Sequence, residues 1–258
     1  MFKKLLITAA ILLSFSVSAE NIILKADNTV SLNTAVTDES TTGIMLDIQR
    51  LNNIETDEPI YLVLNTPGGS VFAGINFIRY ALTSRRPIHT ITIFAASMGF
   101  QIVQALPGKR LMAHSGILMS HRAAVGGLGG QYPGELNVRV NFLADISTDL
   151  DSGVAKRAGI SLKEYQDLIH DEYYANNSKA LKDGFADESV GVACDASLEG
   201  TYNKEFQTFF GPVDVEFSKC PLFTSYISAK FKNITSENSG VNAAELITVG
   251  RQVGKKSL

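Results

Sequence analysis

The sequence predicts an α/β fold in which parallel strands carry helices on their outside. Segments with strand character and segments with a helical period alternate along residues 29–120, in the order β-α-β-α-β-β. The connections between them are short, which favours neighbouring parallel strands. Two turns, Pro67-Gly68-Gly69 and Ser97-Met98-Gly99, directly follow strands. Because open α/β sheets bind ligands at the carboxyl ends of their strands, we expect the functional site at these turns.

The elements up to residue 122 follow from the periodicity of their apolar residues. A short strand near residue 29 precedes a helix that begins after an N-cap in residues 37–40. A buried strand at 60–64, a second helix and a strand in residues 88–94 follow, and two short strands are expected around His114-Ser115-Gly116. The apolar positions that mark the two helices are Ile44, Ile48, Leu51, Ile75, Ile78 and Leu82.

A long amphipathic helix is predicted after residue 133, and a second helix is predicted to begin at Ser161. The apolar stripe of the long helix consists of Leu136, Val140, Leu143, Leu150 and Val154. The charged residues expected outside the stripe are Asp149, Asp151, Lys156 and Arg157.

Residues 1–19 have the composition of a secretory signal peptide. Lys3 and Lys4 form the positive region, residues 5–15 the apolar stretch, and Val17-Ser18-Ala19 a cleavage site after Ala19. The apolar stretch is shorter than the roughly 20 residues that span a bilayer, and retention as an uncleaved anchor is the alternative. No later segment reaches transmembrane length, so we expect an exported protein, periplasmic or secreted, with no membrane span after cleavage.

The charge and the cysteines limit the partners. Loss of the two leader lysines leaves 21 basic against 26 acidic side chains, a formal charge of −5, which argues against nucleic acid or an anionic membrane. Cys194 and Cys220 are the only cysteines, and in an oxidising compartment they predict one disulfide. Two cysteines without a following histidine do not make a structural zinc site, so we expect no metal and no cofactor.

Ser97 has the surroundings that acyl transfer needs. A serine hydroxyl requires a base to accept its proton, and the oxyanion that forms requires backbone N–H donors. His121 is the histidine best placed to be the base. The Gly68-Gly69 turn offers backbone without side chains, and the helix after Ser97 offers the N–H of Met98.

The motifs, taken in order, resemble the ClpP serine peptidase family of the wider crotonase-like superfamily. "NTPGGSVFAG", "AASMG" and "GKRLMAHSGILMSHR" followed by "GGLGGQ" are similar to that family's glycine turn, nucleophile motif and histidine segment. The resemblance implies a repeated β-β-α spiral fold with a helical handle. It implies Ser97 as nucleophile, His121 as base, and the N–H groups of Gly69 and Met98 as oxyanion donors. We expect a signal peptide at 1–19, a ClpP-like peptidase domain at 20–190, and a small C-terminal extension at 191–258 that contains the disulfide.

The resemblance also implies a third catalytic residue in "LIHDEYYANNSKALKDGF". Counting back from Gly184 gives Glu172, with Asp171 as the alternative one residue earlier. A glutamate can orient an imidazole as an aspartate does, from a backbone set further back.

These residues predict an exported serine endopeptidase that acts on peptides or unfolded protein segments. The resembling family forms heptameric rings through the handle, so we expect a homo-oligomeric ring. Only about ten residues separate Ala19 from the first expected strand, which is short for loops that meet an ATP-driven unfoldase, so no ATPase partner is expected. The alternatives are a catalytically inactive crotonase-like scaffold that binds a peptide or protein partner, and an enzyme acting on acyl thioesters.

Overall fold

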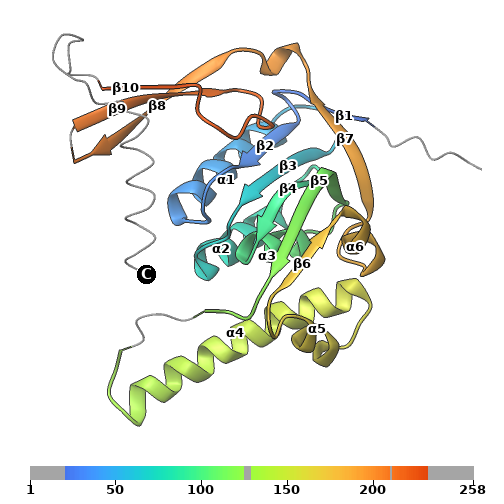
Figure 1. Ribbon diagram of the computed structural model, residues 1–258, viewed down its shortest axis with the longest axis vertical. Helices are drawn as coiled ribbons and strands as arrows, with labels where there is room; N and C mark the ends of the chain where they lie inside the picture. Colours follow the sequence, from blue (N-terminus) through green and yellow to red (C-terminus); the bar gives the residue numbers. More distant parts are fainter. Residues whose placement is uncertain (1–20, 125–128, 210, 232–258) are drawn as a thin grey trace, which may run out of the picture.

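The computed structural model describes residues 21–124, 129–209 and 211–231, and it contains a seven-stranded sheet (Figure 1). The strand order is β1-β7-β5-β4-β3-β2, with β6 on β5. All pairs are parallel except β5 with β6. The elements are β1 (Asn21–Leu24), β2 (Thr29–Leu32), α1 (Asp38–Asn52), β3 (Ile60–Thr66), α2 (Val71–Ala81), β4 (Ile88–Ala96), α3 (Met98–Ala105), β5 (Arg110–Ser120), α4 (Gly134–Ala158), α5 (Leu162–Leu168), β6 (Tyr173–Asn176), α6 (Asn177–Lys182), β7 (Glu188–Cys194), a 3-10 turn (Ala196–Leu198), β8 (Thr201–Thr208), β9 (Gly211–Ser218) and β10 (Ser228–Phe231). The predicted α/β class with a parallel sheet is confirmed.

The predicted helix starts are confirmed by their caps. Thr37 and Ser40 form a capping box at α1, each side chain bonding the other's backbone N–H. The Ser70 hydroxyl accepts the N–H of Ala73 and caps α2. Ser161 and Glu164 form a second capping box at α5, where the sequence predicted the helix to begin. These short polar side chains satisfy N–H groups that the first turn of a helix leaves unpaired.

Two predictions about strands were wrong. The first strand is β1, which pairs with β7 and begins at Asn21, well before residue 29. Its four residues carry only two buried apolar side chains, Ile22 and Leu24, too few to reveal alternation in the sequence. The segment around His114-Ser115-Gly116 belongs to one strand, β5, and does not separate two.

A bulge at Ser115 lets β5 serve two neighbours. Ser115 has a positive φ of 63°, and the register with β4 shifts between Thr92 and Phe94. Before the bulge β5 pairs with β7, and after it β5 pairs with β6. The second half of β5, which leads to His121, therefore turns away from β7 and toward β6, the strand after α5.

Both faces of the sheet are covered. The larger core lies between the sheet and the helices and includes side chains from α1 to α5, among them Ile48, Phe77, Phe100 and Tyr165. A smaller cluster on the other face contains Val63, Ile91 and Leu111 and packs against Leu198 and Leu222 of the C-terminal segment. Strands buried on both faces read as continuous apolar runs, as in "IYLVL" of β3.

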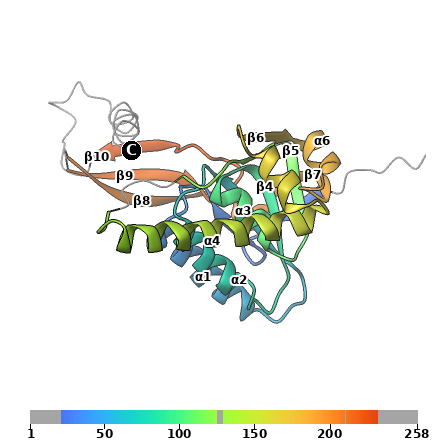
Figure 2. The ribbon, with the colours of Figure 1, turned by 90° about the horizontal axis from the view of Figure 1, so that it is seen from below.

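Helix α4 packs along only part of its length. In Figure 1 its C-terminal half lies beside α5, whereas its N-terminal half projects past the sheet; Figure 2 shows it crossing in front of α3. Val138, Val140 and Phe142 in the projecting half are exposed. The buried residues are Asp151, Val154 and Ala155. The prediction that Asp151 lies outside the buried face was therefore wrong, because the helix turns that face toward the pocket described below.

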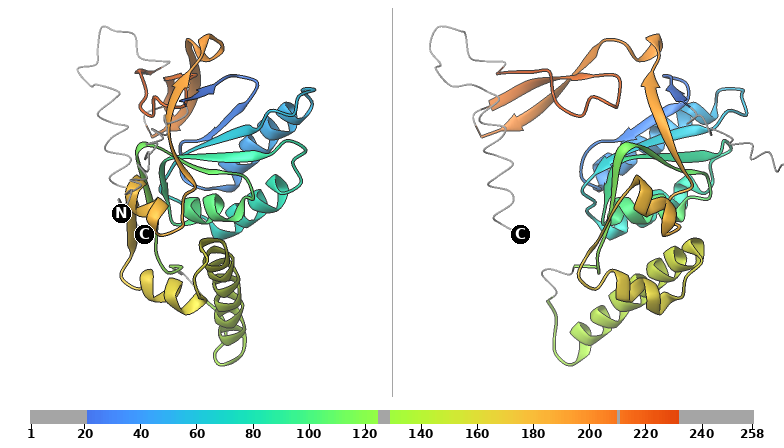
Figure 3. Two further views of the ribbon diagram at one scale, coloured as in Figure 1. Left: turned by 90° about the vertical axis from the view of Figure 1, so that its right-hand side faces the viewer. Right: turned by 45° about the vertical axis from the view of Figure 1, so that its right-hand side comes forward.

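The C-terminal segment forms a small antiparallel sheet, β8-β9-β10, that extends from the body as an arm (Figure 3). A disulfide joins Cys194, the last residue of β7, to Cys220 after β9. The Nδ2 of Asn33 also donates to the carbonyl of Pro221 at 3.4 Å. The base of the arm is thus held to the parallel sheet by a covalent link and by a contact to the segment after β2.

No helix within the described ranges is long and apolar enough to cross a membrane. The predicted signal peptide and the chain after residue 231 lie outside these ranges.

Candidate active site

Ser97 lies in a sharp turn between β4 and α3. Its φ of 55° and ψ of −119° are rare for a residue with a side chain, and such strain concentrates at functional sites. Its N–H donates to the carbonyl of Met119 on β5 at 3.0 Å, which fixes the turn to the neighbouring strand. The side chain is half-buried at the N-terminus of α3.

The glycine turn after β3 packs directly on Ser97. Gly68 and Gly69 have φ values of 89° and 149°. A Cβ on Gly68 would lie 2.6 Å from Ser97 Cβ and 2.8 Å from the nitrogen of Met98, so only glycine fits. Val36 fixes the turn from the other side, donating its N–H to the carbonyl of Gly68 and accepting from Ser70 N–H, each at 2.8 Å.

Two backbone N–H groups at these turns are open to a ligand. Within the described residues, no acceptor bonds the N–H of Gly69 or of Met98. Met98 is the first residue of α3, and the first N–H groups of a helix have no partner inside the helix. The positive end of the helix dipole adds to the attraction for a negative charge there.

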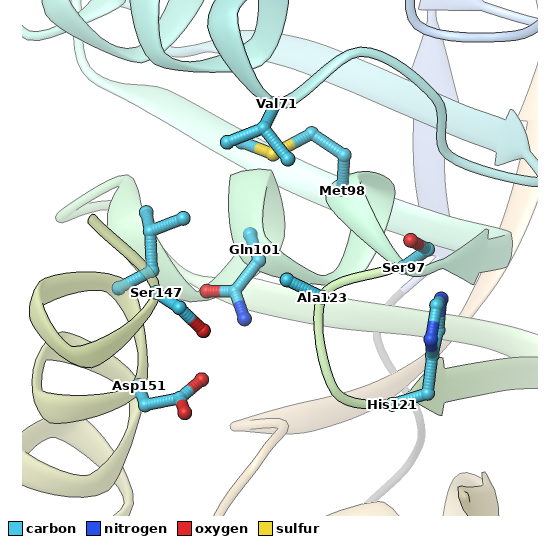
Figure 4. A pocket seen from close by; sticks show the side chains of 9 residues that line it. Val71, Ser97, Met98, Gln101, His121, Ala123, Ser147 and Asp151 are labelled. Atoms are coloured by element: carbon cyan, nitrogen blue, oxygen red, sulfur yellow. The ribbon is translucent and has the colours of Figure 1, made fainter. Parts of the chain in front are cut away.

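His121 reaches the same place from β5. Ala96 and Met119 are the last pair of residues between β4 and β5. Ser97 follows Ala96 directly and His121 lies two residues after Met119, so both leave the sheet at the same edge. Figure 4 shows the imidazole rising from the end of β5 toward the turn that carries Ser97. Both residues line one pocket. In the described part of the chain no hydrogen bond joins their side chains, and such catalytic bonds are often long before substrate binds.

The two candidate acids differ in register. Ser120 and Tyr173 are the last pair of this antiparallel ladder, and His121 and Glu172 are the next residues on the two segments. Asp171 is set one residue further back, and its carboxylate contacts Nδ1 of His170 at 2.7 Å. Glu172 is exposed, has a φ of 74°, and makes no side-chain hydrogen bond within the described ranges. The register favours Glu172, whose role stays a prediction.

The sequence profile of the family described as Clp protease matches residues 17–192. The chain belongs to the Clp protease family. An ATP-dependent Clp protease proteolytic subunit of Streptococcus pyogenes serotype M5 (strain Manfredo) is 28% identical over 167 residues, covering 64% of this chain and 85% of that protein. Proteins of the same description from Streptococcus equi subsp. equi (strain 4047) and subsp. zooepidemicus (strain H70) match equally well. By this distant homology the chain is a ClpP-family serine peptidase.

In this Clp-family chain the pocket beside Ser97 and His121 has a polar end. The cavity measures about 40 Å³. Its lining residues are Val71, Ser97, Met98, Gln101, His121, Ala123, Ser147, Leu150 and Asp151. Figure 4 shows Val71 and Met98 on one side, with the polar ends of Gln101, Ser147 and Asp151 pointing toward the interior at the other end.

Asp151 is the pocket residue that sequence reasoning missed. Its side chain is 8% exposed, and burial raises the pKa of its carboxyl above the usual value, although a hydrogen bond from Gln166 and the charge of Arg122 oppose this. A usable signal was present in the sequence, because Asp151 stands three residues before Val154 and so shares its face of the helix.

The pocket wall next to Asp151 is also hydrogen-bonded. The hydroxyls of Ser120 and Tyr165 lie 2.7 Å apart, and Tyr165 also bonds Gln101. Burial raises the pKa of Tyr165, so this phenol stays neutral over the physiological range. No group of three or more His, Cys, Asp or Glu side chains suited to a metal occurs among the residues that the structure describes.

Proposed function

We propose that this Clp-family protein is an exported serine endopeptidase that hydrolyses peptides or unfolded protein segments without an ATPase partner. One observation carries the proposal: the strained Ser97 turn, the Gly68-Gly69 turn and His121 meet at one pocket. This set supplies a nucleophile, a base and unpaired N–H donors, which are the components that acyl transfer requires.

In the proposed mechanism Ser97 Oγ attacks the substrate carbonyl while His121 accepts the hydroxyl proton. The N–H groups of Gly69 and Met98 stabilise the oxyanion, and His121 returns the proton to the leaving amine. Water then hydrolyses the acyl-enzyme by the same sequence of proton transfers. Glu172 orients the imidazole and stabilises its protonated form. Preorganised N–H donors of this kind are worth about 10²- to 10³-fold in rate each.

Two features support export. The leader at residues 1–19 has the three parts of a signal peptide. The Cys194–Cys220 disulfide belongs to an oxidising compartment and is uncommon in the cytosol. The mature chain after export should begin at Glu20 and lose two hydrogens per disulfide, which intact mass spectrometry before and after reduction measures. Export with free thiols would contradict this part of the proposal.

Independence from an unfoldase rests on the compartment and on the N-terminus. An ATP-driven unfoldase would find no ATP outside the cytoplasm. After the predicted cleavage, β1 begins at Asn21, two residues past Ala19, which leaves almost no chain for axial loops. The relatives are named ATP-dependent; we expect this protein to cleave short peptides at a rate that ATP leaves unchanged.

The exposed apolar residues of α4 support a ring or other homo-oligomer. Val138, Val140 and Phe142 lie on the half of α4 that projects from the body. Three large apolar side chains that stay exposed on one helix do not stabilise a monomer, whereas a subunit interface would bury them.

A second candidate function is a binding scaffold without catalysis. The missing Ser97–His121 hydrogen bond and the exposure of Glu172 favour it. The decisive experiment is labelling of the purified mature protein with a fluorophosphonate, mapped by peptide mass spectrometry. We expect label on Ser97, none on Ser97→Ala, and full label on Ser178→Ala, which changes an exposed serine of α6. A folded, assembled sample that takes no label would favour the scaffold.

A further inference from the structure

The pocket beside Ser97 is where a substrate side chain has to lie. Ser97 and His121 form its mouth, and Val71 and Met98 form one wall. When a carbonyl carbon sits within reach of Ser97 Oγ, the side chain of the same residue points into the adjacent cavity. The residues on the side of that cavity away from Ser97 then select which side chain enters.

The side of the cavity away from Ser97 carries a buried acid without a cation. Asp151 is 8% exposed, and its hydrogen-bond partner Gln166 is a neutral amide. Arg122 influences the carboxylate electrostatically, yet it is exposed and forms no ion pair with Asp151 among the described residues. Gln101 and Ser147 add further polar atoms at this end (Figure 4).

A buried carboxylate of this kind is costly unless a cation meets it. Proteins normally pair buried charges, and a buried carboxyl without a cation has a raised pKa, as Asp151 does. A ligand that brings a cation to this carboxyl would stabilise its charged form. A lysine or arginine side chain brings a cation at the tip of a slender apolar stem. Val71 and Met98 on one side of the cavity offer apolar surface along which such a stem can pack.

We propose that Asp151 is a specificity-determining residue that binds the lysine or arginine side chain preceding the cleaved peptide bond. The stem lies along Val71 and Met98, and the cation meets the Asp151 carboxylate, with Gln101 and Ser147 as hydrogen-bond partners. This inference rests on the proposed peptidase function. It gives that function a substrate class: peptides and unfolded segments with basic residues.

The test compares two peptidyl diaryl phosphonates that differ only in the side chain next to the reactive phosphorus, lysine or leucine. Both label the active-site serine of the full mature protein, and the readout is the ratio of the two rate constants. A partly unfolded sample lowers both rates together and leaves the ratio unchanged. We expect the wild type to react at least tenfold faster with the lysine probe.

Three variants sharpen the result. Asp151→Asn keeps the shape and removes the charge, so the lysine-to-leucine ratio should fall at least tenfold, consistent with the strength of buried charge pairs. Asp151→Leu should reverse the preference. Asp145→Asn removes an exposed carboxylate from the same helix and should keep the wild-type ratio.

The outcomes separate the two proposals. A wild type that prefers leucine, or an Asp151→Asn ratio equal to that of the wild type, would overturn the role of Asp151 and leave the peptidase intact. Absence of label from both phosphonates and from the fluorophosphonate, on folded protein, would overturn the peptidase function and the specificity with it.

Discussion

The turns at Ser97 and at Glu172 share a strained backbone but have opposite surroundings. Both residues carry side chains at positive φ, 55° and 74°. Ser97 is enclosed, because Gly68 packs on it and its N–H bonds Met119. Glu172 is exposed, and its side chain makes no hydrogen bond in the described ranges. Contacts within the chain thus hold the Ser97 turn, whereas the turn of the candidate acid Glu172 is not enclosed in this way.

The difference suggests that the acid side depends on more than one chain. Strained residues persist where surrounding structure holds them in place. Packing does this at Ser97, whereas Glu172 is exposed and precedes the short strand β6. An interface between subunits would add contacts to the second turn and not to the first. The following predictions test this contrast, from the largest expected effect to the smallest.

Glu172→Gln should lower peptide hydrolysis by about 10²- to 10⁴-fold. The amide keeps the size of the side chain and loses the charge that stabilises the protonated imidazole. Asp171→Asn, one residue away, should stay within twofold. Steady-state kinetics on assembled protein measure both. The reverse pattern would transfer the role to Asp171, and two unaffected variants would remove the acid from the mechanism.

Gly68→Ala should slow fluorophosphonate labelling about 100-fold. Its Cβ would stand 2.5 Å from the carbonyl oxygen of Ala96 at a φ of 89°, so the turn must move away from Ser97. A displacement of about 1 Å at a reacting group costs about this much. Gly43→Ala is the control, since nothing lies within 4 Å of its Cβ inside α1. Normal labelling of Gly68→Ala would show that the close packing is dispensable.

Val138→Asp should break the oligomer and lower activity at least tenfold. The residue is 69% exposed in the single chain, so the change removes no internal packing. Asn141→Asp places the same charge at an exposed polar position of α4 and should leave the assembly intact. Light scattering gives the mass, and peptide hydrolysis gives the activity. A fully active monomer would mean that the Glu172 turn needs no partner.

Removal of the disulfide should affect stability far more than catalysis. The double variant Cys194→Ser with Cys220→Ser should unfold with about 3 kcal/mol less free energy, because the link limits the unfolded chain. Labelling of Ser97 at 25 °C should change less than twofold, since Cys194 pairs with Leu24 of the edge strand β1 and neither cysteine lines the pocket. Denaturant unfolding measures the first quantity. A large loss of labelling would mean that the arm supports the active site.

Local patterns sufficed for much of the fold. The helical period of Ile44, Ile48 and Leu51 predicted α1, and Ser161 predicted the start of α5. Each of these signals is local, because it involves only residues within the helix itself or at its start. The strand β1 escaped notice, since its pairing with β7 joins residues about 170 positions apart. Two short strands were predicted where the structure has the single strand β5. The pairing partners that keep β5 continuous across its bulge come from other segments of the chain.

The sequence by itself identified the candidate residues of the site, and the tertiary structure decided how they lie relative to one another. Ser97, the Gly68-Gly69 turn and His121 were identifiable because turn chemistry and residue type are local properties. Only the fold showed that the ladder between β5 and β6 ends at Ser120 and Tyr173, next to His121 and Glu172, and that Asp151 is buried and lines the pocket. Both depend on the ladder between β5 and β6 and on the packing of α4, which are contacts between distant segments that periodicity does not specify.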